Sequence, residues 1–156
     1  MSATVLLKDI VDALEMVSDE FLSFLDLDTG EVETVHRELL GRAEECADDE
    51  EPDLPAWQDE EWEVAKRIVF SDRFRKLPTK FEVHEWAIMR EFADSVESER
   101  IGEELSNSLH GKGAFRYFKD TLRRHRGLES AWFAFRNEAL AEMARDWCEE
   151  NHVEWR

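Results

Sequence analysis

The acidic residues of this chain are concentrated at its N-terminal end. Residues 1–63 contain 21 Asp and Glu side chains and only three Lys and Arg, whereas residues 64–156 contain 17 of each sign. The net charge of −18 therefore belongs to the first 63 residues. Like charges at this density repel one another and are well solvated. The charge balance also excludes a generally basic nucleic-acid coat protein.

The densest acidic stretch predicts a linker at about residues 46–56. Seven of the ten residues from Glu44 to Asp53 are acidic, and such runs are well solvated and usually mobile. Pro52 and Pro55 support this interpretation, because each removes a backbone donor and disfavours helix before it. In the alternative interpretation, the acidic segment docks on a basic partner or imitates a phosphate backbone.

The rest of the composition indicates an ordinary folded core. A chain of 156 residues can bury roughly 68–70% of the surface that it exposes when unfolded. Phe, Ile, Leu and Val make up a quarter of the residues, which exceeds the ~20% below which highly charged chains tend to stay disordered. No repeat period is visible in the sequence. We therefore expect residues 1–156 to form a single compact domain.

The sequence predicts a cytoplasmic protein without a membrane partner. Its first residues lack the basic start and long apolar run of a signal peptide, and no stretch approaches the ~18 apolar residues that span a membrane. Cys46 and Cys148 are far apart in unlike surroundings, which is typical neither of a disulfide framework nor of a four-ligand zinc site. We expect no cofactor and no metal.

The N-terminal part reads as helix, hairpin, helix. Apolar residues at helical spacing predict a helix over about 8–17. Two β-prone runs at 21–27 and 31–35 flank Asp28-Thr29-Gly30, which is a hairpin signal because glycine readily adopts the positive φ of such a turn. Residues 36–46 can form a second helix, although Gly41 weakens it.

The remainder of the chain is mostly helical. Helical spacing predicts a helix over 57–70, and residues 74–78 look extended. Further stripes predict helices ended by Gly111 and Gly127, and then a long last helix; the stripes are Val83-Ala87-Ile88-Phe92, Ile101-Leu105-Leu109, Phe115-Phe118-Leu122 and Trp132-Phe135-Ala139-Met143-Trp147. The predicted fold class is α+β, predominantly α-helical, with a small antiparallel β-hairpin near the N-terminus packed on helices.

One segment indicates contact with an anion. Two glycines precede a helix start, where free backbone N–H groups and the helix dipole favour negative charge. The basic side chains of this helix fall within about a 60° arc, beside rather than within the apolar stripe. The predicted anion-binding residues are Gly111, Lys112, Gly113, Arg116, Lys119 and Arg123. The hypothesis is that they bind a phosphate-bearing ligand, with nucleic acid as one candidate.

The same segment also has a purely structural interpretation. Gly111 and Gly113 can simply form a tight turn between helices, and the basic edge can pair with the acidic half of the same protein. The segment is not a P-loop, because the spacing G-x-x-x-x-G-K-[ST] does not occur.

No catalytic motif is complete. His84-Glu85 begins like a zincin motif, but Ile88 stands where the second histidine is needed. Glu82, His84, Glu85 and Glu91 could ligate a metal only if the fold gathered them, and capping or surface roles are more ordinary for them. No G-x-S-x-G elbow is present, and Cys148 reads as a buried structural thiol. We therefore assign no catalytic residues.

The tryptophans have two interpretations. Most aromatic residues fall on helical stripes, where a core would place them. Trp57, Trp62 and Trp155 lie near the predicted linker or the end of the chain and are the better candidates for a contact surface. Core packing is the more ordinary role even for these three.

Several motifs together resemble a known bacterial family, the uncharacterised protein family 0158. They are Leu14-Glu15-Met16 with Ser18-Asp19-Glu20, Leu25-Asp26-Leu27-Asp28-Thr29-Gly30-Glu31-Val32, Leu77-Pro78 leading into Phe81-Glu82-Val83-His84-Glu85-Trp86, Ile88-Met89, the segment Gly111 to Asp120, Trp132-Phe133-Ala134-Phe135-Arg136 and Trp147-Cys148-Glu149-Glu150-Asn151. The resemblance covers nearly the whole chain except the acidic linker. It implies one compact cytosolic domain and brings no functional residues with it.

These observations favour a non-catalytic interaction or regulatory module. In the alternative, the protein is an enzyme acting on a phosphate-containing substrate, with the same basic residues holding the anion and His84 or His110 moving a proton. In a third interpretation, the acidic N-terminal region engages a basic protein partner.

Overall fold

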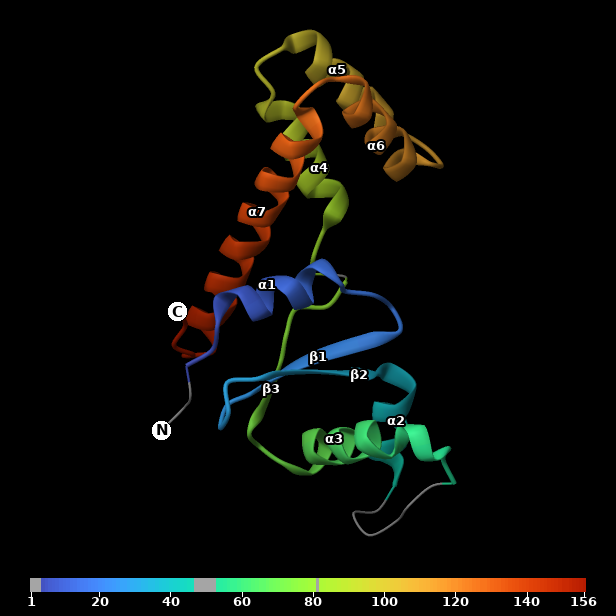
Figure 1. Cartoon of the computed structure of the whole chain (residues 1–156), viewed down its shortest axis with the longest axis vertical. Helices are drawn as coiled ribbons and strands as arrows, with labels where there is room; N and C mark the ends of the chain where they lie inside the picture. Colours follow the sequence, from blue (N-terminus) through green and yellow to red (C-terminus); the bar gives the residue numbers. More distant parts are fainter. Residues whose placement is uncertain (1–3, 47–52, 81) are drawn as a thin grey trace. The chain divides into compact units, whose positions relative to one another are not determined.

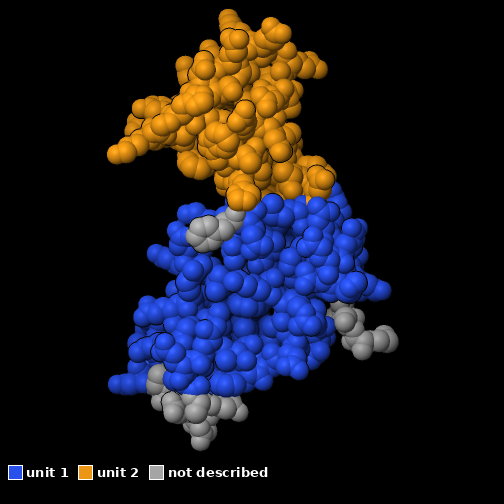
Figure 2. Space-filling view, turned by 180° about the vertical axis from the view of Figure 1, so that it is seen from behind, with its two compact units in different colours: residues 1–83, 143–156 blue, residues 84–142 orange. Residues whose placement is uncertain are grey.

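A computed structural model describes residues 4–46, 53–80 and 82–156. The predicted acidic linker falls largely on residues 47–52, which lie outside the described residues. The chain divides into two compact units (Figure 2): unit 1 comprises residues 1–83 and 143–156, and unit 2 comprises residues 84–142. The expectation of a single domain stays a prediction.

A three-stranded antiparallel sheet forms the middle of unit 1. β1 (Phe21–Asp26) pairs with β2 (Val32–His36) on one side and with β3 (Phe74–Lys76) on the other, in the order β2-β1-β3. Gly30, in the turn between β1 and β2, has a φ of 78°, which glycine adopts without steric strain. The predicted hairpin is confirmed, and residues 74–78, which the sequence predicts to be extended, contain β3.

Helices cover both faces of this sheet (Figure 1). α1 (Leu7–Glu15) lies over one face, while α2 (Arg37–Glu45) and α3 (Asp59–Phe70) lie on the other. A short 3₁₀ turn, Ala56–Gln58, precedes α3. The helices expected at 8–17, 36–46 and 57–70 are thereby confirmed. Their apolar faces meet the sheet because strand side chains alternate between its two faces.

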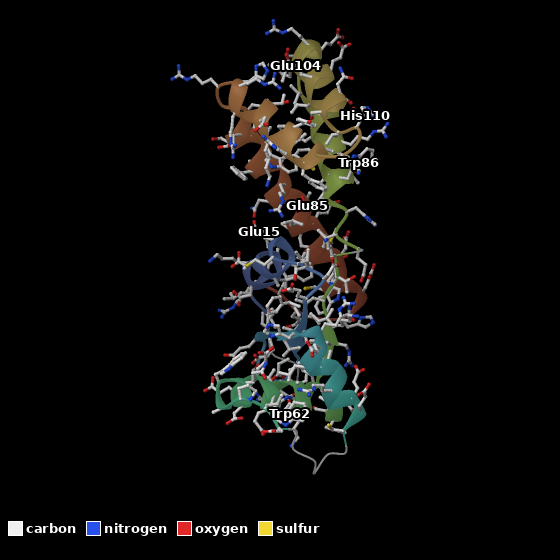
Figure 3. The ribbon with its side chains drawn as sticks, turned by 90° about the vertical axis from the view of Figure 1, so that its right-hand side faces the viewer. Glu15, Trp62, Glu85, Trp86, Glu104 and His110 are labelled. Atoms are coloured by element: carbon white, nitrogen blue, oxygen red, sulfur yellow. The ribbon has the colours of Figure 1, made fainter. Side chains whose placement is uncertain are left out.

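The core between the sheet and the helix pair α2 and α3 is largely aliphatic and aromatic. Its buried residues are Phe24, Val35, Leu39, Leu40, Ala43, Trp62, Ala65 and Phe74. Trp62 is therefore a core residue, 5% exposed, and not part of a contact surface (Figure 3). Trp155 is half-buried, whereas Trp57 is 75% exposed.

A buried carboxylate holds the hairpin turn. Asp26 Oδ1 accepts a hydrogen bond from the backbone N–H of Asp28 at 2.9 Å, and Asp26 Oδ2 pairs with the guanidinium of Arg73 at 3.0 Å. Pairing and hydrogen bonding offset the cost of removing a carboxylate from water. Because Arg73 immediately precedes β3, this contact ties the turn of the hairpin to the start of the third strand.

Unit 2 is helical. It contains α4 (Glu85–Ser95), α5 (Glu99–Ser108), α6 (Ala114–Arg124) and the first part of α7 (Leu128–Glu150), whose residues from Met143 onward belong to unit 1. Gly111 and Gly127, which the sequence places at helix ends, have positive φ angles of 76° and 79°. Their left-handed conformation agrees with the prediction, although α5 and α6 end three residues before them, at Ser108 and Arg124.

An aromatic cluster forms the core of unit 2. Phe92 of α4, Phe118 of α6, and Trp132 and Phe135 of α7 contact one another with ring centroids 5.1 to 6.4 Å apart. Tilted and edge-to-face pairs at these distances add to the stabilisation from burial alone. Phe118 is fully buried, so the cluster determines which side of α6 faces inward.

The protein is therefore an α+β protein, mainly helical, with one antiparallel sheet of three strands among the described residues. Of the helices in the described ranges, none combines the length and the apolar character that crossing a membrane requires.

Two helical glycines test the packing in both units. A Cβ at Gly41 of α2 would meet nothing within 4 Å, whereas one at Gly102 of α5 would lie 3.0 Å from the carbonyl oxygen of Ala93 in α4. We expect Gly41→Ala to raise the free energy of unfolding by about 0.5–1 kcal/mol through helix propensity.

Gly102→Ala should instead lower the free energy of unfolding by about 1–2 kcal/mol, because a backbone oxygen cannot move aside. Urea unfolding followed by circular dichroism measures both changes, and stabilisation by Gly102→Ala would contradict the close approach of α4 and α5.

Candidate functional site

The candidate site lies at the start of α6 in unit 2. The turn before it contains Gly111 and Gly113, with φ angles of 76° and 81°. Gly113 is the residue that caps α6, and a Cβ there would lie 3.3 Å from the ring of Tyr117. A side chain at Gly113 would thus meet both backbone strain and a steric contact. This position therefore needs glycine for structural reasons.

The first turn of α6 leaves backbone donors available. The first hydrogen bond of the helix runs from the N–H of Tyr117 to the carbonyl of Gly113 at 2.9 Å. The cap provides no side-chain hydrogen bond, and no acidic residue lies in the first turn. The N–H groups of the first helical residues have no partner within the helix and carry partial positive charge.

Four basic residues, Lys112, Arg116, Lys119 and Arg123, form what we call the α6 basic face. All four are exposed, as the sequence predicts. Within the described residues, Lys112, Arg116 and Lys119 form no ion pair or hydrogen bond through their side chains. Arg123 differs, because its guanidinium lies 3.8 Å from the carboxylates of both Asp120 and Glu129. Three of the four cations therefore have no partner in the described part of the chain and can meet a ligand.

The apolar side of α6 differs from the predicted stripe at one position. Phe118 and Leu122 are buried, but Phe115 is 52% exposed. Ala114 and Thr121 are buried in its place, because these small residues face the interior and shift the buried arc away from Phe115. The prediction that Phe115 belongs to the buried stripe is wrong.

Two exposed aromatic side chains near the turn were not predicted from the sequence as contact residues. Tyr117 is 55% exposed and Trp86 is 41% exposed. The indole N–H of Trp86 donates to the carbonyl of Leu109 at 3.0 Å, so Trp86 lies near the turn that holds His110 (Figure 3). Helical spacing alone gives no signal for these residues, since each lies outside the apolar stripe of its helix.

The far end of α6 is anchored by a histidine. His125 Nε2 lies 2.6 Å from a carboxylate oxygen of Glu104 in α5. The hydrogen bond to His125 holds the pKa of Glu104 below its ordinary value of 4.5, although desolvation acts in the opposite direction. Near the same end, Arg124 donates to the hydroxyl of Thr121 at 2.9 Å. These contacts fix α6 without using its basic face.

The residues considered for catalysis are not brought into one cluster. Glu82 accepts hydrogen bonds from the N–H and hydroxyl of Thr79, which is the capping role that the sequence favours. Glu85 instead forms a partly buried ion pair with Arg136 of α7. His84 and His110 are exposed, and their side chains form no hydrogen bond, ion pair or ring contact with the described residues. Within residues 4–46, 53–80 and 82–156, no three His, Cys, Asp or Glu side chains are arranged to hold a metal ion.

Cys148 has the environment of a structural thiol. It is fully buried, and burial, with a smaller contribution from the charge of Glu149, raises its pKa to about 11. A thiol that stays protonated near neutral pH is a poor nucleophile. The expected structural role of Cys148 is confirmed by its burial.

The anchor at the end of α6 predicts a pH-dependent stability. Because the pKa of Glu104 is lowered in the folded protein, its contribution is present above the unfolded value and is lost as the pH falls through the folded value. We expect Glu104→Gln to lower the urea midpoint near pH 7 and to have no effect in acid, where the wild-type carboxyl is protonated. Glu103→Gln, on the same helix, is the matched control. A loss of stability from Glu104→Gln that is equal in acid would contradict the role of the carboxylate.

The two cysteines predict unequal alkylation. Cys148 is buried, whereas Cys46 is half-buried. We expect iodoacetamide near pH 8 to label Cys46 well before Cys148 in the folded protein, because Cys148 needs both exposure and deprotonation to react. Peptide mass spectrometry measures the two rates, and labelling in urea shows that both thiols are chemically competent. Equal rates in the folded protein would contradict the burial of Cys148.

Comparison with known proteins places the chain in a family. The model described as "Uncharacterised protein family (UPF0158)" matches residues 3–156. A Pseudomonas aeruginosa protein named UPF0158 protein PA5073 is 33% identical over 67 residues, which are 43% of this chain and 44% of that protein. The match thus spans less than half the length of that relative. No solved structure matches the chain. With a match across almost its full length, the chain belongs to the uncharacterised protein family UPF0158.

Proposed function

We propose that this protein is a cytoplasmic, non-catalytic interaction module that binds phosphate groups through the α6 basic face. The observation that carries the proposal is the exposure of Lys112, Arg116 and Lys119 without ionic partners in the described chain. A folded protein with 38 acidic residues offers many partners for a basic side chain. Three neighbouring cations without such partners are therefore available to an external anion.

The cations form a row along one side of α6. Arg116 and Lys119 are three residues apart, which corresponds to about 4.5 Å along a helix axis, and Arg123 continues the row beside its carboxylate partners. The turn at Gly111 to Gly113 adds backbone N–H groups and Lys112 at the start of the same row.

The exposed ring of Phe115 favours nucleic acid over an acidic protein surface. Phe115 and Lys119 are four residues apart, so they are neighbours on the surface of α6. Proteins that bind single strands combine cations for the backbone with aromatic rings on which bases stack. An acidic protein surface would use the cations but would leave the ring in water.

Single-stranded RNA of about twelve nucleotides, followed by fluorescence anisotropy, tests the proposal. With three phosphate contacts, the logarithm of the affinity should fall against the logarithm of the salt concentration with a slope of about −2. Arg116→Ala combined with Lys119→Ala should weaken binding roughly tenfold and make the slope shallower by about 1.4.

The matched control removes two cations elsewhere. Lys66→Ala combined with Arg67→Ala on α3 changes the net charge by the same amount and should leave binding nearly unchanged. Equal loss in both double variants, or no RNA binding at low salt, would reject the proposal. A polyglutamate peptide provides the comparison for an acidic partner: if it binds and RNA does not, the α6 basic face is a protein contact.

A further inference from the structure

A groove of about 810 Å³ lies on one face of the sheet in unit 1. One wall is the side of α1 that carries residues at positions i, i+3, i+4 and i+7, which share a helix face. The floor is made by alternate residues of β1 and β2, which share a face of the sheet. These residues are Asp9, Asp12, Ala13 and Met16 on the wall, and Phe21, Ser23, Val32 and Thr34 on the floor.

The wall and the floor of the groove both leave apolar surface exposed. Met16, at the end of α1, is 80% exposed, and Phe21 is 36% exposed. Val32, Leu77 and Pro78 line the same hollow. In the middle of the floor, the hydroxyls of Ser23 and Thr34 satisfy each other at 2.9 Å, so no polar group there needs a small ligand. Apolar lining around a satisfied polar pair suits aliphatic side chains.

β2, which contributes Val32 and Thr34 to the groove, is an edge strand of the sheet. The N–H of Asp26 donates to the carbonyl of Glu31, and the N–H of Arg37 donates to the carbonyl of Glu20. In an antiparallel pair every second residue bonds across the ladder, so the residues of β2 that bond to β1 are Glu33 and Val35. The N–H and C=O groups of the residues between them, Val32, Thr34 and His36, point away from β1.

This outer edge of β2 is covered only at its end. The N–H of His36 donates to a carboxylate oxygen of Glu61 at 2.7 Å. The outward N–H and C=O groups of Val32 and Thr34 have no hydrogen-bond partner among the described residues. An edge of this kind is a template for one more strand.

The acidic side chains around the groove favour a partner strand with basic side chains. Four carboxylates line it, those of Asp9, Asp12, Glu20 and Glu31. The single basic residue in the lining, Lys80, lies 3.3 Å from the carboxylate of Asp19. Long basic side chains can place their methylene stems on apolar surface and their charged ends at such a rim.

We infer that an extended, basic segment of a partner protein adds to β2 as a fourth strand and inserts every second side chain into this groove. Main-chain hydrogen bonds to Val32 and Thr34 supply affinity, and alternate Lys or Arg side chains reach the acidic rim. The inference concerns unit 1 alone and does not rest on the α6 basic face.

A second copy of this chain is a poorer occupant. Its β2 edge carries the same acidic residues, so pairing two such edges would bring Glu31 and Glu33 of one chain near their counterparts, and like charges across strands are destabilising. The partner segment must therefore differ in sequence and in charge.

An eight-residue peptide of alternating Arg and Val, labelled with fluorescein, is the probe. We expect it to bind, and the same peptide with Glu in place of Arg not to bind. A third peptide keeps the Arg and Val side chains but has two N-methylated backbone amides, and it should bind about tenfold more weakly because it lacks the donors for strand addition. Equal binding of the N-methylated peptide, or no binding of the basic peptide, overturns the inference.

Variants of the protein separate a specific site from general attraction. Asp12→Lys combined with Glu31→Lys reverses two exposed charges of the groove and should weaken the peptide at least tenfold. Glu44→Lys combined with Glu63→Lys reverses two exposed charges on α2 and α3 and is the matched control. If both double variants weaken the peptide equally, binding is general attraction to an acidic protein and the inference is wrong.

Amide hydrogen exchange locates the added strand. In the free protein the amides of Val32 and Thr34 should exchange rapidly, while those of Glu33 and Val35 are protected by β1. The basic peptide should slow exchange at Val32 and Thr34 and leave Glu33 and Val35 as they were. Rapid exchange at Val32 and Thr34 in the saturated complex, or prior protection of both by self-association, contradicts strand addition at β2.

Discussion

The hydrogen bonding of β1 on both of its sides is the constraint on which unit 1 depends. Phe24 lies opposite Glu33 of β2 and Lys76 of β3, and a slip of one residue in either pairing would send every strand side chain to the opposite face. Asp26 prevents such a slip at the turn, since its buried carboxylate binds both the turn and Arg73. The pairing register of β1 with β2 and β3 therefore determines both which side chains form the core against α2 and α3 and which line the groove beside α1.

Phe118 has the corresponding role in unit 2. It is fully buried and packs against the rings of Phe92 and Trp132. Since successive residues of a helix are turned by 100°, fixing Phe118 inward leaves Arg116 and Lys119 on the solvent side. The exposure of these cations thus follows from aromatic packing, and the glycine turn at Gly113 only sets where the helix begins.

Most of the fold could be predicted because its signals are local. The hairpin is marked by Gly30 between two β-prone runs, and helix ends are marked by Gly111 and Gly127, all of which have positive φ. The exposure of Phe115 could not be predicted. The stripe Phe115-Phe118-Leu122 indicates the buried side of α6 only to within a wide arc, and Phe115 lies at the edge of that arc. The inward side of α6 is decided by Ala114 and Thr121, whose small side chains carry little hydropathy signal.

The groove could not be predicted from the sequence, for a different reason. Its wall and floor come from α1, β1, β2 and the residues after β3, and nothing in any one of these segments indicates that a hollow remains between them. Each acidic residue of the rim also reads, by itself, as an ordinary solvated side chain. The candidate anion site could be predicted because its glycines and cations are neighbours in the chain; the groove is a tertiary feature.

The strongly negative net charge does not decide what this protein binds. Counted over the sequence, unit 1 carries −16 and unit 2 only −2, while residues 110–126 carry +5. At physiological ionic strength, exposed charges act over about 8 Å, so a ligand responds to the residues that it touches. Salt weakens binding at either surface, and for that reason salt dependence alone does not distinguish them. The sign of the ligand does: under the two proposals, a polyanion binds the α6 basic face and a basic peptide binds the acidic rim of the groove.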